Sequence, residues 1–111
     1  MTPDAFIALA SGLAMVKAKT VLGAVRLAVG GKTFATVGWP QAGWAVVKLA
    51  PTDQQALVSA SAGVMPEPGG RGRKGVTLLH LRDVGEARAK SVVIAAWRHA
   101  QAPGHPLSNT G

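Results

Sequence analysis

Cysteine is absent from this 111-residue sequence, which excludes a disulfide, a thiolate metal site and a cysteine nucleophile. Acidic residues are scarce. Five Asp and Glu stand against twelve Lys and Arg, so the net charge is +7 at pH 7. This imbalance favours nucleic acid or another anionic surface as a partner, although it carries no information about the fold. A basic protein without an anionic partner is the alternative that composition leaves open.

Long hydrophobic runs are also lacking, because no apolar stretch reaches the roughly twenty residues that a bilayer-spanning helix needs. The first fifteen residues are apolar, but Asp4 stands where a signal peptide has its basic region, and the first lysine is Lys17. We therefore expect a soluble cytoplasmic protein. The 48% apolar content predicts one core in a single domain over residues 1–101, followed by a flexible tail over residues 102–111.

Hydrophobic periodicity predicts a helix near the start of the chain. Thr2-Pro3-Asp4 has the chemistry of a helix start, since it combines a capping hydroxyl, a proline at the first position and a carboxylate near the positive end of the helix dipole. Apolar residues at spacings of three and four extend the helix to about Ala14. Residues 15–23 show no clear period and are predicted as a connector.

From Ala24 the apolar period changes to two, which is typical of strands. Gly30-Gly31 supplies the two residues of a tight hairpin, and a second turn lies between Trp39 and Gly43. These features predict a three-stranded antiparallel meander over residues 24–29, 33–37 and 44–49.

The second half of the sequence predicts two helices with one strand between them. A helix begins at Pro51 and stops before Gly63, a strand covers residues 76–81, and Asp83 caps a last helix whose apolar stripe includes Trp97. The predicted order is α-β-β-β-α-β-α. This order indicates the α+β class, with a mainly antiparallel sheet covered on one face by helices.

A basic, glycine-rich loop precedes the last predicted strand. The segment from Gly69 to Gly75 contains four glycines, which adopt positive φ at little steric cost, together with Arg71, Arg73 and Lys74. Its letters match the dinucleotide fingerprint G-x-G-x-x-G, but that fingerprint must open a helix, and this segment opens a strand. The sequence therefore predicts a flexible loop that can follow a polyanion.

Neither a metal site nor an enzyme active site is predicted. His80, His99 and His105 fall on a strand, at a helix end and in the tail, without a carboxylate spaced to join them. The aspartates all stand at predicted helix starts, where the helix dipole explains them. We expect no cofactor and no catalytic group, and a cluster around His80 and Glu67 is the remaining enzymatic alternative.

Basic residues accumulate in the β-rich half of the sequence, where turns and outward strand positions can meet phosphate. A solvated surface is the alternative for such charges. Trp39 and Trp44 flank a turn and are candidates to stack on a base, with packing in the core or turn as the alternative, whereas Trp97 is predicted to lie in the core. The predicted nucleic-acid-binding residues are Arg26, Lys32, Lys48, Arg71, Arg73 and Lys74.

Four segments resemble the MmcQ/YjbR family: Leu27 to Ala35, Val47-Lys48-Leu49, Gly70 to Leu81, and Ala95-Ala96-Trp97-Arg98. The resemblance covers about residues 4–101 and rests mostly on the spacing of small and apolar residues. It implies a CyaY-like α+β fold with a double-wing arrangement, and a DNA-binding role without an established enzymatic activity.

The sequence thus favours a non-enzymatic nucleic-acid-binding protein of weak sequence preference, in which the hairpin tip at Lys32 and the glycine-rich loop contact phosphates. The alternative is a protein-interaction or small-ligand-binding module that uses a sheet edge or a cleft beside Trp39 and Trp44.

Overall fold

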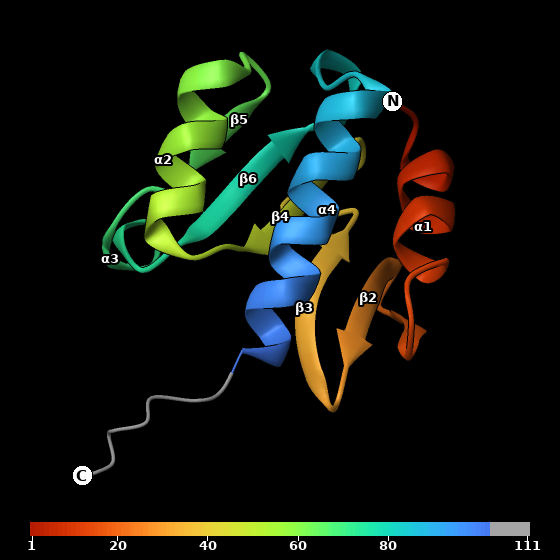
Figure 1. Cartoon of the computed structure of the whole chain (residues 1–111). Helices are drawn as coiled ribbons and strands as arrows, with labels where there is room; N and C mark the ends of the chain where they lie inside the picture. Colours follow the sequence, from red (N-terminus) through yellow and green to blue (C-terminus); the bar gives the residue numbers. More distant parts are fainter. Residues whose placement is uncertain (103–111) are drawn as a thin grey trace, which may run out of the picture.

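The computed structural model describes residues 1–102 and confirms an α+β fold. Its six-stranded sheet is antiparallel throughout, in the order β1-β2-β3-β4-β6-β5. Helices α1, α2 and α4 lie on one side of this sheet (Figure 1). The predicted tail lies, apart from Ala102, outside the described residues. The elements are α1 (Pro3–Ser11), β1 (Val16–Val21), β2 (Ala24–Val29), β3 (Lys32–Val37), β4 (Trp44–Lys48), α2 (Pro51–Ala60), β5 (Val64–Pro66), α3 (Gly70–Arg73), β6 (Val76–His80), the 3-10 helix η1 (Leu81–Asp83) and α4 (Glu86–Gln101).

The core lies between the sheet and the helices α1 and α4. Leu27, Ala35 and Val47 lie side by side on three adjacent strands, and none of them is more than 2% exposed. Val92 of α4 and Phe6 of α1 close this layer from the helical side, both at 0% exposure. Removal of these apolar side chains from water is the main force that holds the helices on the sheet.

The predicted meander is confirmed, and its first turn has the geometry that the sequence indicated. Gly30 and Gly31 join β2 to β3 with φ of 58° and 79°. Two consecutive residues with positive φ match the twist of the flanking strands, which explains the pair of glycines. A β-bulge between β2 and β3 lies beside Leu27 and Ala28.

The prediction of a connector over residues 15–23 is wrong, because Val16–Val21 forms the edge strand β1. It pairs with β2 from Val16↔Val29 to Val21↔Ala24. The joining turn places Leu22 at φ 52° and Gly23 at φ 83°. Leucine rarely adopts positive φ, so the pair Leu22-Gly23 is not a sequence signal for a hairpin turn in the way that two consecutive glycines are.

Two helix boundaries also differ from the prediction. Helix α1 ends at Ser11 instead of about Ala14, although the Thr2 hydroxyl caps it as expected and accepts from the Ala5 N–H at 3.1 Å. Helix α4 begins after Gly85, so Asp83 does not cap it. Asp83 lies in η1, where its carboxylate faces the ring of His80.

The glycine-rich segment is not an open loop, because Gly70–Arg73 forms the short helix α3. Its position is fixed by close backbone contacts on both sides. A Cβ on Gly72 would lie 1.7 Å from the Glu67 carbonyl oxygen, and a Cβ on Gly75 would lie 1.8 Å from that of Leu49. The glycines therefore serve close packing here as well as conformational freedom.

A buried glutamine ties α2 to this segment. The Gln54 amide donates to the carbonyl oxygens of Gly72 at 2.9 Å and Val76 at 3.2 Å, and to the Thr77 hydroxyl at 3.0 Å. The Thr77 hydroxyl in turn donates to the Gly75 carbonyl at 3.0 Å. These bonds connect one helix to both ends of the turn that leads from α3 into β6.

Replacement Gln54→Leu is expected to lower the free energy of unfolding by about 1–3 kcal/mol, because buried acceptors lose their donor. The measurement is a urea titration of the wild type and the variant. Gln55→Leu is the matched control, since Gln55 is the next residue of α2 and is exposed. Equal loss in both variants would contradict the role of the buried amide.

Within residues 1–102, the helices are too short or too polar for any of them to cross a bilayer.

Candidate nucleic-acid interface

The two faces of the sheet differ because side chains alternate along each strand. Leu27, Ala35 and Val47 point toward the helices, so the positions between them point to the other side. We call this second side the open face. The strand pairing places on this face Lys17 and Lys19 of β1, Arg26 of β2, Thr36 of β3, Trp44, Val46 and Lys48 of β4, and Leu78 and His80 of β6.

Positive charge is concentrated on the strands of the described chain. In residues 1–102 the strands carry five Lys and Arg and neither Asp nor Glu, and all of these cations except Lys32 belong to the open face. Helices α1, α2 and α4 carry three acids, Asp4, Asp53 and Glu86, against three cations, Arg88, Lys90 and Arg98. These three helices are therefore electrically balanced, and the excess positive charge lies on the strands, in α3 and in the turn after α3.

A hollow of about 450 Å³ crosses the open face. Its floor is made of small and apolar groups, among them Ala24, Gly38 and the nearly buried Val46. Leu22 and Trp39 border it at one end of the strands. Lys48 at the end of β4 and Arg71 of α3 border the other end, and Arg26 lines the middle. The hollow thus has an apolar and aromatic end and a cationic end.

Arg71 reaches this hollow although it lies 22 residues after Leu49, the residue that follows β4. The Leu49 N–H donates to the Gly75 carbonyl at 2.9 Å, which holds the turn after α3 beside the end of β4. The Arg71 guanidinium lies 3.3 Å from the Glu67 carboxylate, but 68% of its side chain stays exposed. An exposed ion pair of this kind contributes at most about 1 kcal/mol, so it leaves the guanidinium available to another anion.

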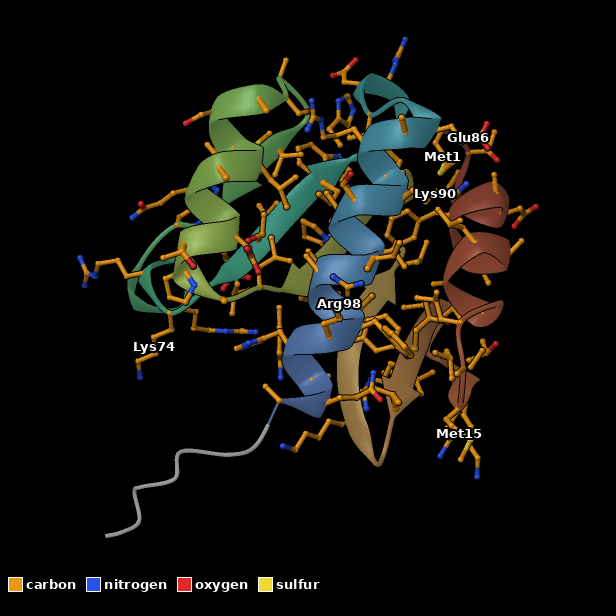
Figure 2. The ribbon with its side chains drawn as sticks, viewed as in Figure 1. Met1, Met15, Lys74, Glu86, Lys90 and Arg98 are labelled. Atoms are coloured by element: carbon orange, nitrogen blue, oxygen red, sulfur yellow. The ribbon has the colours of Figure 1, made fainter. Side chains whose placement is uncertain are left out.

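The other predicted cations do not line the hollow. Lys32 pairs with the core residue Val29, so its side chain starts on the helical side of the sheet, and Figure 1 shows the β2–β3 hairpin tip far from α3. Arg73 and Lys74 are exposed beside Arg71, and Lys74 points outward from the end of the segment (Figure 2). The structure therefore brings together Arg26, Lys48 and Arg71, and it separates Lys32 from them.

The three tryptophans have different environments. Trp39 is 56% exposed and borders the hollow. Trp44 is half-buried and lies against His80, with ring centroids 4.6 Å apart. Trp97 packs against the core as predicted, and its indole N–H donates to the Ala14 carbonyl at 3.0 Å. Of the two stacking candidates, Trp39 is the one with a free ring.

The histidine and glutamate that could have formed a catalytic cluster are separated. His80 Nδ1 lies 2.6 Å from the Asp83 carboxylate, at one end of β6. The Glu67 N–H donates to Val76 at the other end of that strand, about 13 Å away at the usual rise per residue. In residues 1–102 no three His, Asp or Glu side chains gather in a way that could hold a metal ion. His105 lies outside this range.

Lys17 and Lys19 also belong to the open face, although neither is among the nucleic-acid-binding residues predicted from the sequence. Lys19 pairs directly with Arg26, and Lys17 pairs with Ala28, so both point to the side that carries Arg26. The alternation of Val16 and Ala18 with Lys17 and Lys19 is a short period-two signal, and it is the one sequence feature that points to this strand.

These residues define an α+β protein whose described strands place Lys and Arg, and no Asp or Glu, on the open sheet face. Comparison of the chain with protein-family models, with curated proteins and with solved structures finds no match. The resemblance to the MmcQ/YjbR family accordingly stays a prediction.

Proposed function

We propose that this is a non-enzymatic, cytoplasmic nucleic-acid-binding protein, of the DNA-binding type that the MmcQ/YjbR resemblance implies. One observation carries the proposal. In residues 1–102 the strands place cations from β1, β2 and β4 on the open face and carry no Asp or Glu, and Arg71 of α3 joins these cations, whereas helices α1, α2 and α4 carry equal numbers of acids and cations. A surface of one charge sign attracts a polyanion and supplies most of the affinity for phosphate backbones.

The interface differs in detail from the one that the sequence indicated. Arg26, Lys48 and Arg71 supply the central phosphate contacts, and Lys17 and Lys19 extend them toward the sheet edge. Arginine offers a planar fork of donors that can bind two phosphate oxygens at once. Because α1, α2 and α4 lie on the far side of the sheet, none of them can enter a DNA groove from this face, and sequence preference should be weak.

A small-ligand-binding module is the second candidate, since the volume of the hollow falls within the range of roughly 300–1,000 Å³ that is common for such sites. An anionic ligand would use the same three cations. The two functions differ in salt dependence, because a polymer releases a counterion for every phosphate that the protein neutralises.

The test is fluorescence anisotropy of labelled DNA with the wild-type protein at several salt concentrations. We expect log affinity to fall linearly with log salt, with a slope of about 2 to 4.5 in magnitude for three to five contacts at about 0.7 to 0.9 each. Absence of binding at about 50 mM salt, where such contacts are strong, would overturn the proposal in favour of the second candidate.

A further inference from the structure

We propose that the hollow on the open face holds an unpaired base of a single-stranded nucleic acid, stacked against Trp39, while the adjoining phosphates contact Arg26, Lys48 and Arg71. This inference rests on the proposed function and adds the class of nucleic acid to it. Three observations carry it: the exposure of Trp39, the shape of the hollow, and the separation of its aromatic end from its cationic end.

The exposed indole of Trp39 lacks the stacking partner that Trp44 has. Trp39 is 56% exposed although tryptophan is a costly residue to leave in water. Trp44 has a neighbouring ring in His80 and does not line the hollow. An exposed aromatic ring at the edge of a basic sheet is the arrangement with which proteins stack single-stranded bases.

The hollow exists because small residues occupy one row of the open face. This row runs across the strands from Val21 of β1 to its partner Ala24 of β2 and then to Gly38. The Gly38 N–H donates to the Trp44 carbonyl at 2.7 Å, which connects the row to β4. A larger side chain at Ala24 or Gly38 would fill the space beside Trp39. Thr36 and Val46 form the next row, so the floor offers apolar contact with little steric obstruction.

The cations lie where the backbone of a bound strand would continue. Trp44 and Lys48 mark the two ends of β4, which are about 14 Å apart at the usual rise per residue. Trp39 borders the hollow near the first end, and Lys48 and Arg71 border it at the second. A duplex keeps its bases paired and stacked inside, so it offers no base face on which Trp39 could stack. A single strand can place a base and its phosphates there together.

The test compares a twelve-nucleotide thymidine strand with an abasic strand of the same length, which carries the same phosphates without bases. The wild type should bind the thymidine strand about 5- to 150-fold more tightly, since stacking of one base is worth about 1–3 kcal/mol. The thymidine strand should also quench tryptophan fluorescence.

Three variants assign the effect to the hollow. Trp39→Ala should abolish the preference for the thymidine strand and leave abasic-strand binding unchanged, whereas Trp39→Phe should keep most of the preference. Thr36→Phe fills the floor from a strand position and adds no charge, so it should abolish the preference while the indole remains. Urea titration checks that each variant is folded.

The outcomes separate this inference from the proposed function. Equal affinity of the wild type for the two strands, or a preference that survives both Trp39→Ala and Thr36→Phe, would overturn the base site and leave phosphate binding standing. Failure of the wild type to bind either single strand at low salt would overturn the base site, and failure to bind duplex DNA as well would overturn the proposed function. Binding of free thymidine monophosphate as tightly as the strand would indicate a small-ligand site and also contradict the proposal.

Discussion

Replacement of Gly75 with alanine is expected to lower the free energy of unfolding by about 3 kcal/mol or more. Gly75 has φ of +106°, a conformation that side chains rarely adopt, and an added Cβ would lie 1.8 Å from the Leu49 carbonyl oxygen. Relief of that contact requires the two backbones to separate, which breaks the Leu49 N–H bond to the Gly75 carbonyl. The measurement is the urea midpoint at unchanged slope.

Gly70→Ala is the control for this variant. A Cβ on Gly70 would meet nothing nearer than the Arg73 side chain at 4.0 Å, and the residue lies in α3 without positive φ. Stability should therefore stay within about 0.5 kcal/mol of the wild type or rise slightly, because alanine favours helix. A Gly75→Ala variant as stable as the Gly70→Ala variant would contradict the close contact between Gly75 and the Leu49 carbonyl.

The double variant Arg26→Ala/Lys48→Ala should weaken binding of single-stranded DNA by about tenfold or more at low salt, since two charge-assisted contacts are lost. The magnitude of the salt slope should fall by about 1.4, at about 0.7 for each phosphate contact. Both side chains are exposed, so their removal should leave stability nearly unchanged. Anisotropy titrations at several salt concentrations give the slope.

The matched control is Lys90→Ala/Arg98→Ala, which removes the same charge from the helical side. Lys90 and Arg98 are exposed on α4, and Figure 2 shows them on the helix that covers the sheet. Their loss should leave the salt slope unchanged. An equal fall in slope for the two double variants would mean that net charge, and not the open face, determines binding.

The strongest sequence signals predicted the central elements correctly. The hairpin at Gly30-Gly31 is specified by two residues that readily adopt positive φ, and the last helix by a long apolar stripe that includes Trp97. Long periodic segments determine their own structure because every turn of the pattern points to the same core. The α+β class followed from these elements.

The sequence does not predict the edge strand β1, because the usual signals of a strand are weak there. Ala18 and Thr20 are small or polar residues on the side that faces the helices, and both remain exposed at the sheet edge. The turn that follows uses Leu22 at positive φ instead of asparagine or glycine. Without the strand, Lys17 and Lys19 could not be placed beside Arg26.

The candidate site depended on contacts that are distant in sequence. Local pattern selected Arg26, Lys48 and Arg71 as cations, but their position around one hollow follows from the register of β2 to β4 and from the packing of Gly75 against Leu49. The position of Lys32 at a hairpin tip predicts that it belongs with these cations. The β-bulge beside Leu27 shifts the register of β2 and β3 so that Lys32 pairs with the core residue Val29, and this pairing places Lys32 on the helical side of the sheet.

The most direct test is to map the backbone amide chemical shifts of the protein during titration with a short thymidine strand. We expect the largest changes on the open face and around its hollow, in β1, at Arg26, Trp39 and Lys48, and in α3. Amides of α4 around Lys90 should stay unchanged. Changes concentrated on α1 and α4, with the open face unaffected at saturation, would contradict the central claim that the basic sheet face binds nucleic acid.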